Sequence, residues 1–274
     1  MPELPEVETV RNILKLWVKG KKIKNCNIYY ENVLENVSFC DFKSKIINQK
    51  IHDIERKGKY LIFILDDYVL LSHLRMEGKY YLLDDNRLDK NMNDHKIITF
   101  LLDDNKILLY HDVRKFGKMK LLNKNNYMED ISLAKLGKEP FTITKEELFN
   151  SIKSSNMPIK KLLLDQSNIA GLGNIYADEV LFLSKIHPLR KGKEISEEEC
   201  QIIIENSVIV LNKAIELGGS TIRSYHSGAG VDGKFQNRLN AYGKQGEKCL
   251  FCNNIIEKMF VGGRGTHYCP NCQK

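Results

Sequence analysis

The chain has 274 residues, enough for two modest domains or one large one, and 42% of them are hydrophobic, as in ordinary soluble proteins. No apolar run approaches the roughly 20 residues of a membrane-spanning helix, and no basic leader precedes an apolar stretch. We therefore expect neither a membrane protein nor a secreted one, but a cytoplasmic protein. The net charge of +7 and the pI near 8.9 indicate an anionic partner.

The first eight residues read MPELPEVE, and Pro2 allows two interpretations. Apolar side chains recur at helical spacing from residue 3 to about residue 18, and Gly20 ends the pattern, so we expect a helix there. Proline and acidic residues suit the first turn of a helix, which would make Pro2 a helix starter. Alternatively, removal of Met1 exposes a secondary amine with a pKa of about 8, which is partly uncharged and nucleophilic at neutral pH. Glu3 and Glu6 would then lie close enough to move protons.

From about residue 22 to residue 122, short apolar runs alternate with polar turns. Two pairs of runs have the pattern of β-hairpins, at residues 60–65 with 68–71 and at residues 97–102 with 106–110. Several hairpins in succession predict a β-sandwich or barrel. We expect a helix and β-sandwich domain over residues 1–132, as part of an α+β protein.

Two polar segments, residues 73–78 and 112–117, follow apolar strands and end in glycine, so we expect both at loop tips. Their Met76, Arg114 and Phe116 side chains have the character of a wedge. Proteins that unstack DNA insert such apolar side chains between bases. Packing of Met76 and Phe116 in the core is the simpler alternative at this point.

Residues 133–143 read as a linker, because glycine and proline interrupt any periodic pattern there. The pattern is helical afterwards, and Thr144 with Glu147 has the spacing of a capping box. We expect a second domain over residues 144–274, with helices at about 160–166, 175–185 and 196–218.

A tight turn is expected between two of these helices, at Gly171-Leu172-Gly173-Asn174. Such turns bring backbone N–H groups and a helix N-terminus to one point, which suits an anion, and Asn174 could donate to the same ligand. The turn also needs glycine for steric reasons, so alone it does not identify a ligand.

Four of the seven cysteines form two C-x2-C pairs separated by sixteen residues. This is the pattern of a zinc ribbon with four thiolates in tetrahedral geometry. A set of four cysteines leaves no open coordination position, so we expect one structural Zn²⁺. The ribbon would occupy residues 244–274, and its ligands would be Cys249, Cys252, Cys269 and Cys272.

The C-terminal segment, residues 234–274, carries seven basic and two acidic side chains. Its surplus of five positive charges falls to three when four thiolates and Zn²⁺ are counted, so it stays basic. Between the cysteine pairs, GGRGT predicts a hairpin tip that holds Arg264 outward, where it could contact phosphate. A solvated turn arginine would show the same pattern.

Together these motifs resemble one family. The start MPELPEVET, the segments KYL at residue 59, HLRM at 73, RKFG at 114 and GNIYA at 173, and the ribbon ending YCPNCQK keep their order along the whole chain. They are similar to bacterial formamidopyrimidine-DNA glycosylases. The resemblance implies an N-terminal helix with a β-sandwich, a helix-two-turn-helix domain and a zinc ribbon. It also implies a monomer without membrane association whose partner is damaged double-stranded DNA.

The resemblance implies catalytic roles for four residues. Pro2 would attack C1′ of the damaged nucleotide, and Glu3 would be the general acid and base. Lys59, which its position alone would leave as a solvated lysine, would contact phosphate near the lesion and assist catalysis. Arg264 would bind the phosphates that flank the lesion.

It also implies DNA-binding roles. Glu6 would orient the N-terminus, and three residues would fill the gap left by the everted base, with the arginine pairing to the opposite cytosine: Met76, Arg114 and Phe116. Three residues would hold the DNA backbone: His95, Lys160 and Asn174. A loop over residues 225–235 would close over the flipped base.

The implied activity is that of a DNA glycosylase and AP lyase that removes 8-oxoguanine and formamidopyrimidines through a Schiff base at Pro2, followed by β,δ-elimination. Two other functions remain open. An oxidised-pyrimidine glycosylase of the endonuclease VIII type shares the fold and Pro2, but Leu4 and the set of Met76, Arg114 and Phe116 favour the purine branch. A zinc-ribbon DNA-binding protein without catalysis would bind lesions and never form a covalent bond.

Overall fold

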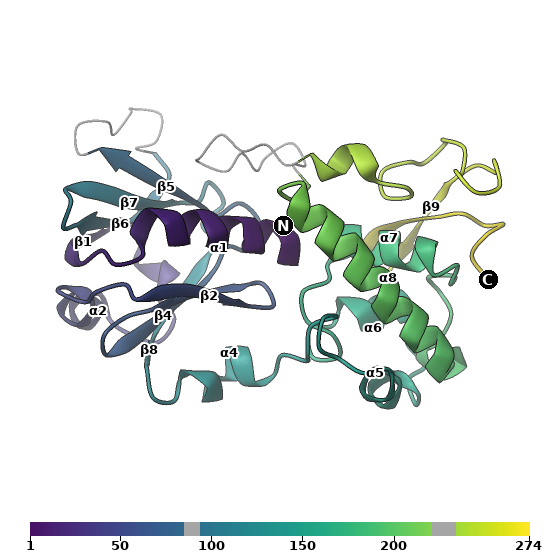
Figure 1. The fold of residues 1–274 in the computed structure, drawn as a ribbon, viewed down its shortest axis with the longest axis horizontal. Coiled ribbons are helices and arrows are strands. Elements are labelled where there is room, and N and C mark those ends of the chain that lie inside the picture. The colour runs from purple at the N-terminus through teal and green to yellow at the C-terminus, as the bar shows by residue number, and fades with distance from the viewer. Residues whose placement is uncertain (85–93, 221–233) are drawn as a thin grey trace. The chain divides into compact units, whose positions relative to one another are not determined.

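The computed structural model of the protein describes residues 1–84, 94–220 and 234–274 (Figure 1). The described chain forms two compact units, Met1–Ala134 as unit 1 and Lys135–Ser220 with Lys234–Lys274 as unit 2. The loop expected over residues 225–235 falls outside the described residues up to position 233. No helix in the described ranges is long and apolar enough to cross a membrane.

Unit 1 contains two four-stranded antiparallel sheets, ordered β1-β6-β7-β5 and β2-β3-β4-β8. The expected hairpins are β3–β4 and β6–β7, so both are confirmed. The strands are β1 (Ile23–Ile28), β2 (Asp53–Lys57), β3 (Tyr60–Ile64), β4 (Tyr68–His73), β5 (Lys79–Asp84), β6 (Lys96–Leu102), β7 (Lys106–His111) and β8 (Lys118–Asn123). The helices are α1 (Leu4–Val18), η1 (Glu31–Val33), α2 (Phe39–Ile46), η2 (Tyr127–Glu129) and α4 (Ile131–Ala134).

One hydrophobic core joins both sheets and α1, as a β-sandwich requires. Phe63 from one sheet and Phe100 from the other belong to it, each 2% exposed. Helix α1 adds side chains at spacings of three and four residues, including Val10 and Leu14. The apolar face of α1 therefore fixes the first turn of the helix against the sandwich.

Helix α2 interrupts a region whose pattern predicts only strands. Ser38 caps it, because the Ser38 hydroxyl accepts a hydrogen bond from Asp41 N–H at 3.2 Å. Phe42 and Ile46, four residues apart, are fully buried and face the core. A serine cap and one buried apolar pair are enough to stabilise a helix of eight residues. They are too few to give a recognisable helical pattern in the sequence.

Unit 2 combines helices with a two-stranded sheet. Helices α5 and α7 both pack on the long helix α8. The elements are α5 (Lys145–Ile152), α6 (Ile159–Leu164), α7 (Asn174–Leu183), η3 (Gly192–Glu194), α8 (Glu197–Glu216), η4 (Phe235–Arg238), β9 (Glu257–Val261) and β10 (Arg264–Tyr268). The capping box at the start of α5 is confirmed: Glu147 N–H donates to the Thr144 hydroxyl at 3.3 Å, and Thr144 N–H donates to the Glu147 carboxylate at 3.0 Å.

The segment after Ala134 belongs to unit 2. Gly137 N–H donates to the Gln166 carbonyl and Ala170 N–H donates to the Lys138 carbonyl, each at 2.9 Å. A side chain at Gly137 would come within 2.5 Å of the Ser167 carbonyl oxygen, so glycine lets the two segments approach. These bonds fasten the segment to the turn before α7.

Candidate functional site

The first turn of α1 holds the acidic residues predicted to act with Pro2. Glu3 and Glu6 are 3% and 5% exposed, and Glu3 N–H donates to the Glu6 carboxylate at 2.8 Å. Pro2 is buried beside them, whereas Met1 is 48% exposed. The positive end of the helix dipole stabilises carboxylates at this position. The capping box thus fixes Glu3 and Glu6 in the segment directly after Pro2, whose nitrogen would become the chain terminus once Met1 is removed.

The turn that carries Lys59 is fastened to the same helix. Arg56 on β2 donates to the Glu8 carboxylate at 2.8 Å and to the Gly58 carbonyl at 2.9 Å. Burial opposes ionisation of Glu8, yet hydrogen bonds from Arg11 and Arg56 outweigh it and hold the Glu8 pKa below its ordinary value. Lys59, next to Gly58, is 6% exposed. Arg56 therefore links the turn, through the Gly58 carbonyl, to Glu8 in the first part of α1.

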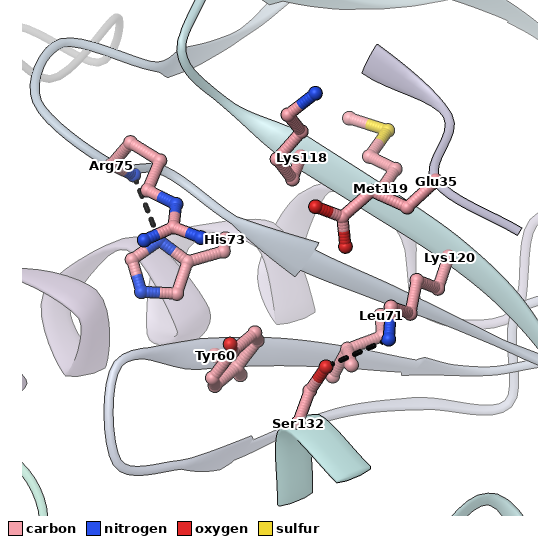
Figure 2. A pocket seen from close by; sticks show the side chains of 9 residues that line it. All are labelled: Glu35, Tyr60, Leu71, His73, Arg75, Lys118, Met119, Lys120 and Ser132. Atoms are coloured by element: carbon pink, nitrogen blue, oxygen red, sulfur yellow. Dashed lines mark hydrogen bonds between the residues drawn. The ribbon is translucent and has the colours of Figure 1, made fainter. Parts of the chain in front are cut away.

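His73, at the end of β4, lies in this part of unit 1, although it was not among the predicted site residues (Figure 2). Its ring packs edge-on against Tyr60 with centroids 4.6 Å apart, and Arg75 N–H donates to its Nδ1 at 3.0 Å. Burial, followed by the charges of Arg75 and Lys59, lowers the pKa of His73 to about 3. The ring is therefore neutral at physiological pH and, with Nδ1 accepting, carries its proton on Nε2.

The loop between β7 and β8 displays the predicted wedge residues. The Asp112 carboxylate, fully buried, accepts hydrogen bonds from Arg114 N–H at 2.9 Å and Gly117 N–H at 2.7 Å. Phe116 is 50% exposed, and the Arg114 guanidinium lies 4.8 Å from its ring centroid. The buried Asp112 thus fixes the backbone of the loop, while the side chains of Arg114 and Phe116 are exposed to solvent. Phe116 is therefore not a core residue.

The loop between β4 and β5, which carries Met76, lies against Tyr110. The loop that carries Arg114 lies against the same side chain. A Cβ at either Gly78 or Gly117 would overlap the Tyr110 hydroxyl. Only glycine lets both loops close on this buried side chain. Met76 is half-buried in its turn. The structure therefore brings Met76 and the Arg114 loop to one edge of the sandwich.

His95 adjoins that edge as well. Its carbonyl accepts a hydrogen bond from Asp112 N–H at 3.1 Å, and its ring packs edge-on against His111 at 5.7 Å. Burial, then the charges of His95 and Lys79, lowers the pKa of His111. Like His73, His111 was not predicted as a site residue. The lowered pKa of each ring comes from burial and from charged neighbours, most of which are distant in sequence.

In unit 2, Arg264 stands at the tip of the β9–β10 hairpin. Gly262 and Gly263 form the two-residue loop with φ of +56° and +76°, and Arg264 pairs with Val261 directly after it. Two left-handed residues are what a tight type I′ hairpin needs. Arg264 is exposed, as the sequence predicts.

Lys160 lies inside unit 2. It is 0% exposed, and its Nζ donates to the Thr266 hydroxyl at 2.7 Å and to the Gly265 carbonyl at 3.2 Å. The Nζ is also 2.6 Å from Asp178 Oδ1, an ion pair outside hydrogen-bond alignment. The expected contact of Lys160 with the DNA backbone would require the ammonium group to leave these partners.

Asn174 meets the same hairpin. Its side-chain amide donates to the Gly265 carbonyl at 3.0 Å, while its Oδ1 is buried without a hydrogen-bond partner among the described residues. Gly171, with φ +103°, shapes the turn before it, and Gln166 bridges the turn by accepting from Gly171 N–H and donating to the Leu172 carbonyl. Two of the predicted backbone-gripping residues, Lys160 and Asn174, therefore converge on the residue after Arg264.

The two acidic residues of α7 are an unpredicted feature of this unit. Asp178 accepts from His267 N–H at 2.8 Å. The Glu179 carboxylate, fully buried, accepts from the backbone N–H groups of residues 240–242, each at 2.8 Å. Burial raises the Glu179 pKa against the opposing effect of these hydrogen bonds. Adjacent acids on a helix usually face solvent, so sequence alone gave no reason to single them out.

The four cysteines fit a zinc ion. All four sulfur atoms lie within 4.8 Å of one another, with Cys249 to Cys272 at 3.8 Å and Cys252 to Cys269 at 3.4 Å. Tetrahedral coordination with Zn–S bonds of about 2.3 Å places sulfur atoms about 3.8 Å apart. The four cysteines belong to one hydrophobic cluster with Phe182 of α7.

Comparisons with known proteins identify related domains along the chain. Three family descriptions match: "Formamidopyrimidine-DNA glycosylase N-terminal domain" over residues 1–119, "Formamidopyrimidine-DNA glycosylase H2TH domain" over 136–226, and "Zinc finger found in FPG and IleRS" over 246–274. A formamidopyrimidine-DNA glycosylase of Bacillus cereus is 46% identical over 276 residues, covering 100% of this chain and 99% of that protein.

Two solved complexes have the same fold over 100% of both chains. A mutant Lactococcus lactis FPG bound to Fapy-dG containing DNA is 41% identical with a TM-score of 0.92. MutM bound to DNA containing carbocyclic 8-oxo-G is 41% identical with a TM-score of 0.91. These similarities confirm the predicted α+β fold with a helix-two-turn-helix domain and a zinc finger. The chain belongs to the formamidopyrimidine-DNA glycosylase family.

Proposed function

We propose that this DNA glycosylase removes oxidised purines from double-stranded DNA and then cuts the strand at the resulting site. The observation that carries the proposal is the first turn of α1, where Glu3 and Glu6 are buried beside Pro2. The substrate class is supported by the two similar proteins, which are bound to DNA containing Fapy-dG or 8-oxo-G. Both are purine lesions, which favours the purine branch over an endonuclease VIII type of pyrimidine glycosylase.

The proposed chemistry begins after Met1 is removed, because the Pro2 nitrogen is otherwise an amide. The Pro2 nitrogen attacks C1′ of a nucleotide turned out of the duplex and the bond from C1′ to the base breaks. The departing base takes up the proton that the Pro2 nitrogen gives up. Glu3 protonates the sugar ring oxygen as the ring opens, leaving an iminium ion at Pro2.

Strand cleavage follows from the same intermediate. The iminium ion withdraws electrons and acidifies the C2′ protons, so a base removes one of them and the 3′ phosphate leaves by β-elimination. A second proton loss expels the 5′ phosphate by δ-elimination. Water then hydrolyses the iminium ion and regenerates Pro2. Glu3 is the group we assign to these proton transfers.

DNA contacts in the proposal come from both units. The elements that would meet the phosphate backbone carry Lys59, His95, Asn174 and the exposed Arg264. Met76, Arg114 and Phe116 would replace the everted base in the stack, supported by their common edge of the sandwich. One Zn²⁺ held by the four cysteines would brace the hairpin of Arg264. The protein would act as a monomer.

A cleavage assay tests the activity and its substrate class. Matched duplexes would contain 8-oxoguanine opposite cytosine or thymine glycol opposite adenine. We expect faster cleavage of the 8-oxoguanine duplex, leaving phosphate at both new ends as β,δ-elimination requires. Faster cleavage of the thymine glycol duplex would assign the chain to pyrimidine repair. Lesion binding without cleavage, in protein confirmed to begin at Pro2, would assign it to a non-catalytic DNA-binding function.

A further inference from the structure

A fully buried ion pair underlies the Arg264 hairpin. Lys160 on α6 and Asp178 on α7 are both 0% exposed, with Nζ and Oδ1 2.6 Å apart. Taking two charges out of water costs several kcal/mol per ion and is offset only when further hydrogen bonds satisfy both groups. Here the hydrogen bonds to Gly265, Thr266 and His267 go to one strand, β10, which begins with Arg264.

Lys160 reaches Arg264 through a single hydroxyl. The Thr266 hydroxyl accepts a hydrogen bond from Lys160 at 2.7 Å and donates one to the Arg264 carbonyl at 3.0 Å. This chain of bonds uses the hydroxyl as acceptor and donor at once, which fixes its orientation. The backbone of Arg264 is therefore fastened to the ammonium group of Lys160.

The neighbouring residues of β10 are held in the same way. The Gly265 carbonyl accepts from both Lys160 and Asn174, at 3.2 and 3.0 Å. Asp178 accepts from His267 N–H at 2.8 Å. Asn174 and Asp178 are four residues apart and so share one face of α7, which packs on β10. Every residue from Arg264 to His267 thus has a polar tie to α6 or α7, directly or through Thr266.

We infer that Lys160 and Asp178 are positioning residues that aim Arg264 at DNA phosphate, and that Lys160 does not itself contact the phosphate. The inference rests on the proposed function only in taking Arg264 as a phosphate contact. The pair sets the direction of the hairpin tip, and the side chain of Arg264 alone projects from it. Binding of DNA then depends on an acidic residue as much as on a basic one.

The acidic partner makes the inference testable. Removing a negative charge from a DNA-binding protein strengthens binding if charge alone matters, because phosphate repulsion falls. Loss of the Asp178 charge instead leaves the buried Lys160 without its counter-ion. An asparagine that still accepts from His267 N–H turns its NH2 group toward the Lys160 ammonium, so the hairpin loses part of its support. The electrostatic and positioning roles therefore predict opposite signs for Asp178→Asn.

The experiment uses the full-length zinc-loaded chain and a duplex with a tetrahydrofuran abasic analogue, which tests binding without requiring chemistry. Dissociation constants would be measured over a range of salt concentrations. We expect Asp178→Asn and Lys160→Met each to weaken binding about tenfold, close to the effect of Arg264→Ala, since a misdirected Arg264 loses its one charge-assisted phosphate bond. Matched controls on exposed residues, Glu205→Gln and Lys193→Met, separate these effects from the loss of a surface charge.

A double-mutant cycle decides whether Lys160 acts through Arg264. In the Arg264→Ala background, Lys160→Met should change affinity by less than about twofold and leave the salt slope unchanged. A further loss in that background, with the slope falling by about one, would show direct phosphate contact by Lys160 and overturn the inference. Binding by Asp178→Asn as tight as that of the unaltered chain would overturn it too.

A folding control keeps the outcome interpretable. Lys160→Met with Asp178→Leu replaces both charges by apolar groups and so avoids an unpaired buried ion. We expect this double variant to retain one zinc per chain and cooperative unfolding, yet to bind the duplex about tenfold more weakly, because Thr266 and His267 lose their partners. Unchanged binding by this variant would contradict the positioning role. A chain that fails the cleavage assay while these binding differences persist would reject the proposed chemistry and leave the positioning role standing.

Discussion

At the residue scale, side chains in this protein take their character from neighbours that are remote in sequence. His73 ends a strand and would be an ordinary histidine with a pKa near 6.5 in a flexible chain. In the fold, burial beside Arg75 and Lys59 lowers its pKa to about 3. Lys160 is similar, since a lysine in an amphipathic helix is normally solvated, whereas here it is fully buried against Asp178.

His73 predicts a pH dependence of stability. Its pKa is lower in the folded chain than in the unfolded chain, so the unfolded chain binds more protons between about pH 6.5 and pH 3. The stability it contributes is complete above pH 6.5 and is lost as the pH falls through that window. We expect the unfolding free energy to fall between pH 7 and pH 5 by about 2 kcal/mol more in the unaltered chain than in His73→Asn.

Urea unfolding of both proteins at the two pH values measures this difference. His52→Asn is the matched control, because His52 is an exposed histidine on the same unit. An equal fall of the unfolding free energy in the unaltered chain and in His73→Asn would show that His73 becomes charged in the folded chain as readily as in the unfolded chain, and would contradict the lowered pKa.

At the element scale, the sequence predicts those elements whose signals are local. The helical period before Gly20, the capping box at Thr144 and the two C-x2-C pairs each involve residues close together in the chain, and the structure contains all three. Helix α2 has a weaker local signal, a serine cap and one apolar pair, and was not predicted. The hydrogen-bond acceptors of Lys160 on β10, Gly265 and Thr266, lie more than a hundred residues away, and its ion-pair partner Asp178 is on another helix, so no local pattern could show its burial.

The zinc ribbon is an element whose order depends on its metal. Cys249→Ser would remove one thiolate and, with it, most of the zinc affinity. We expect DNA binding to weaken about tenfold, as for loss of one charged phosphate contact, because the hairpin that carries Arg264 is no longer braced. Cys40→Ser, which changes an exposed cysteine in unit 1, should leave binding and zinc content unchanged. Zinc content and duplex affinity measured on the same samples check both expectations, and full affinity in zinc-free Cys249→Ser would refute the bracing role.

At the scale of the whole molecule, each unit carries one part of the proposed activity. Unit 1 holds the proposed nucleophile Pro2, just before α1, and the proposed wedge residues on two loops that close on Tyr110. Unit 2 holds the ribbon, the turn before α7 and the hairpin of Arg264.

The central claim is that Pro2 is the nucleophile, and covalent trapping tests it most directly. Protein confirmed by mass spectrometry to begin at Pro2 would be mixed with an 8-oxoguanine duplex and sodium borohydride, which reduces an iminium ion to a stable amine. We predict a protein–DNA adduct whose attachment maps to the Pro2 nitrogen, and no adduct when Met1 is retained. An adduct that maps to a lysine, or none from protein with a free Pro2 that still binds the duplex, would contradict the claim.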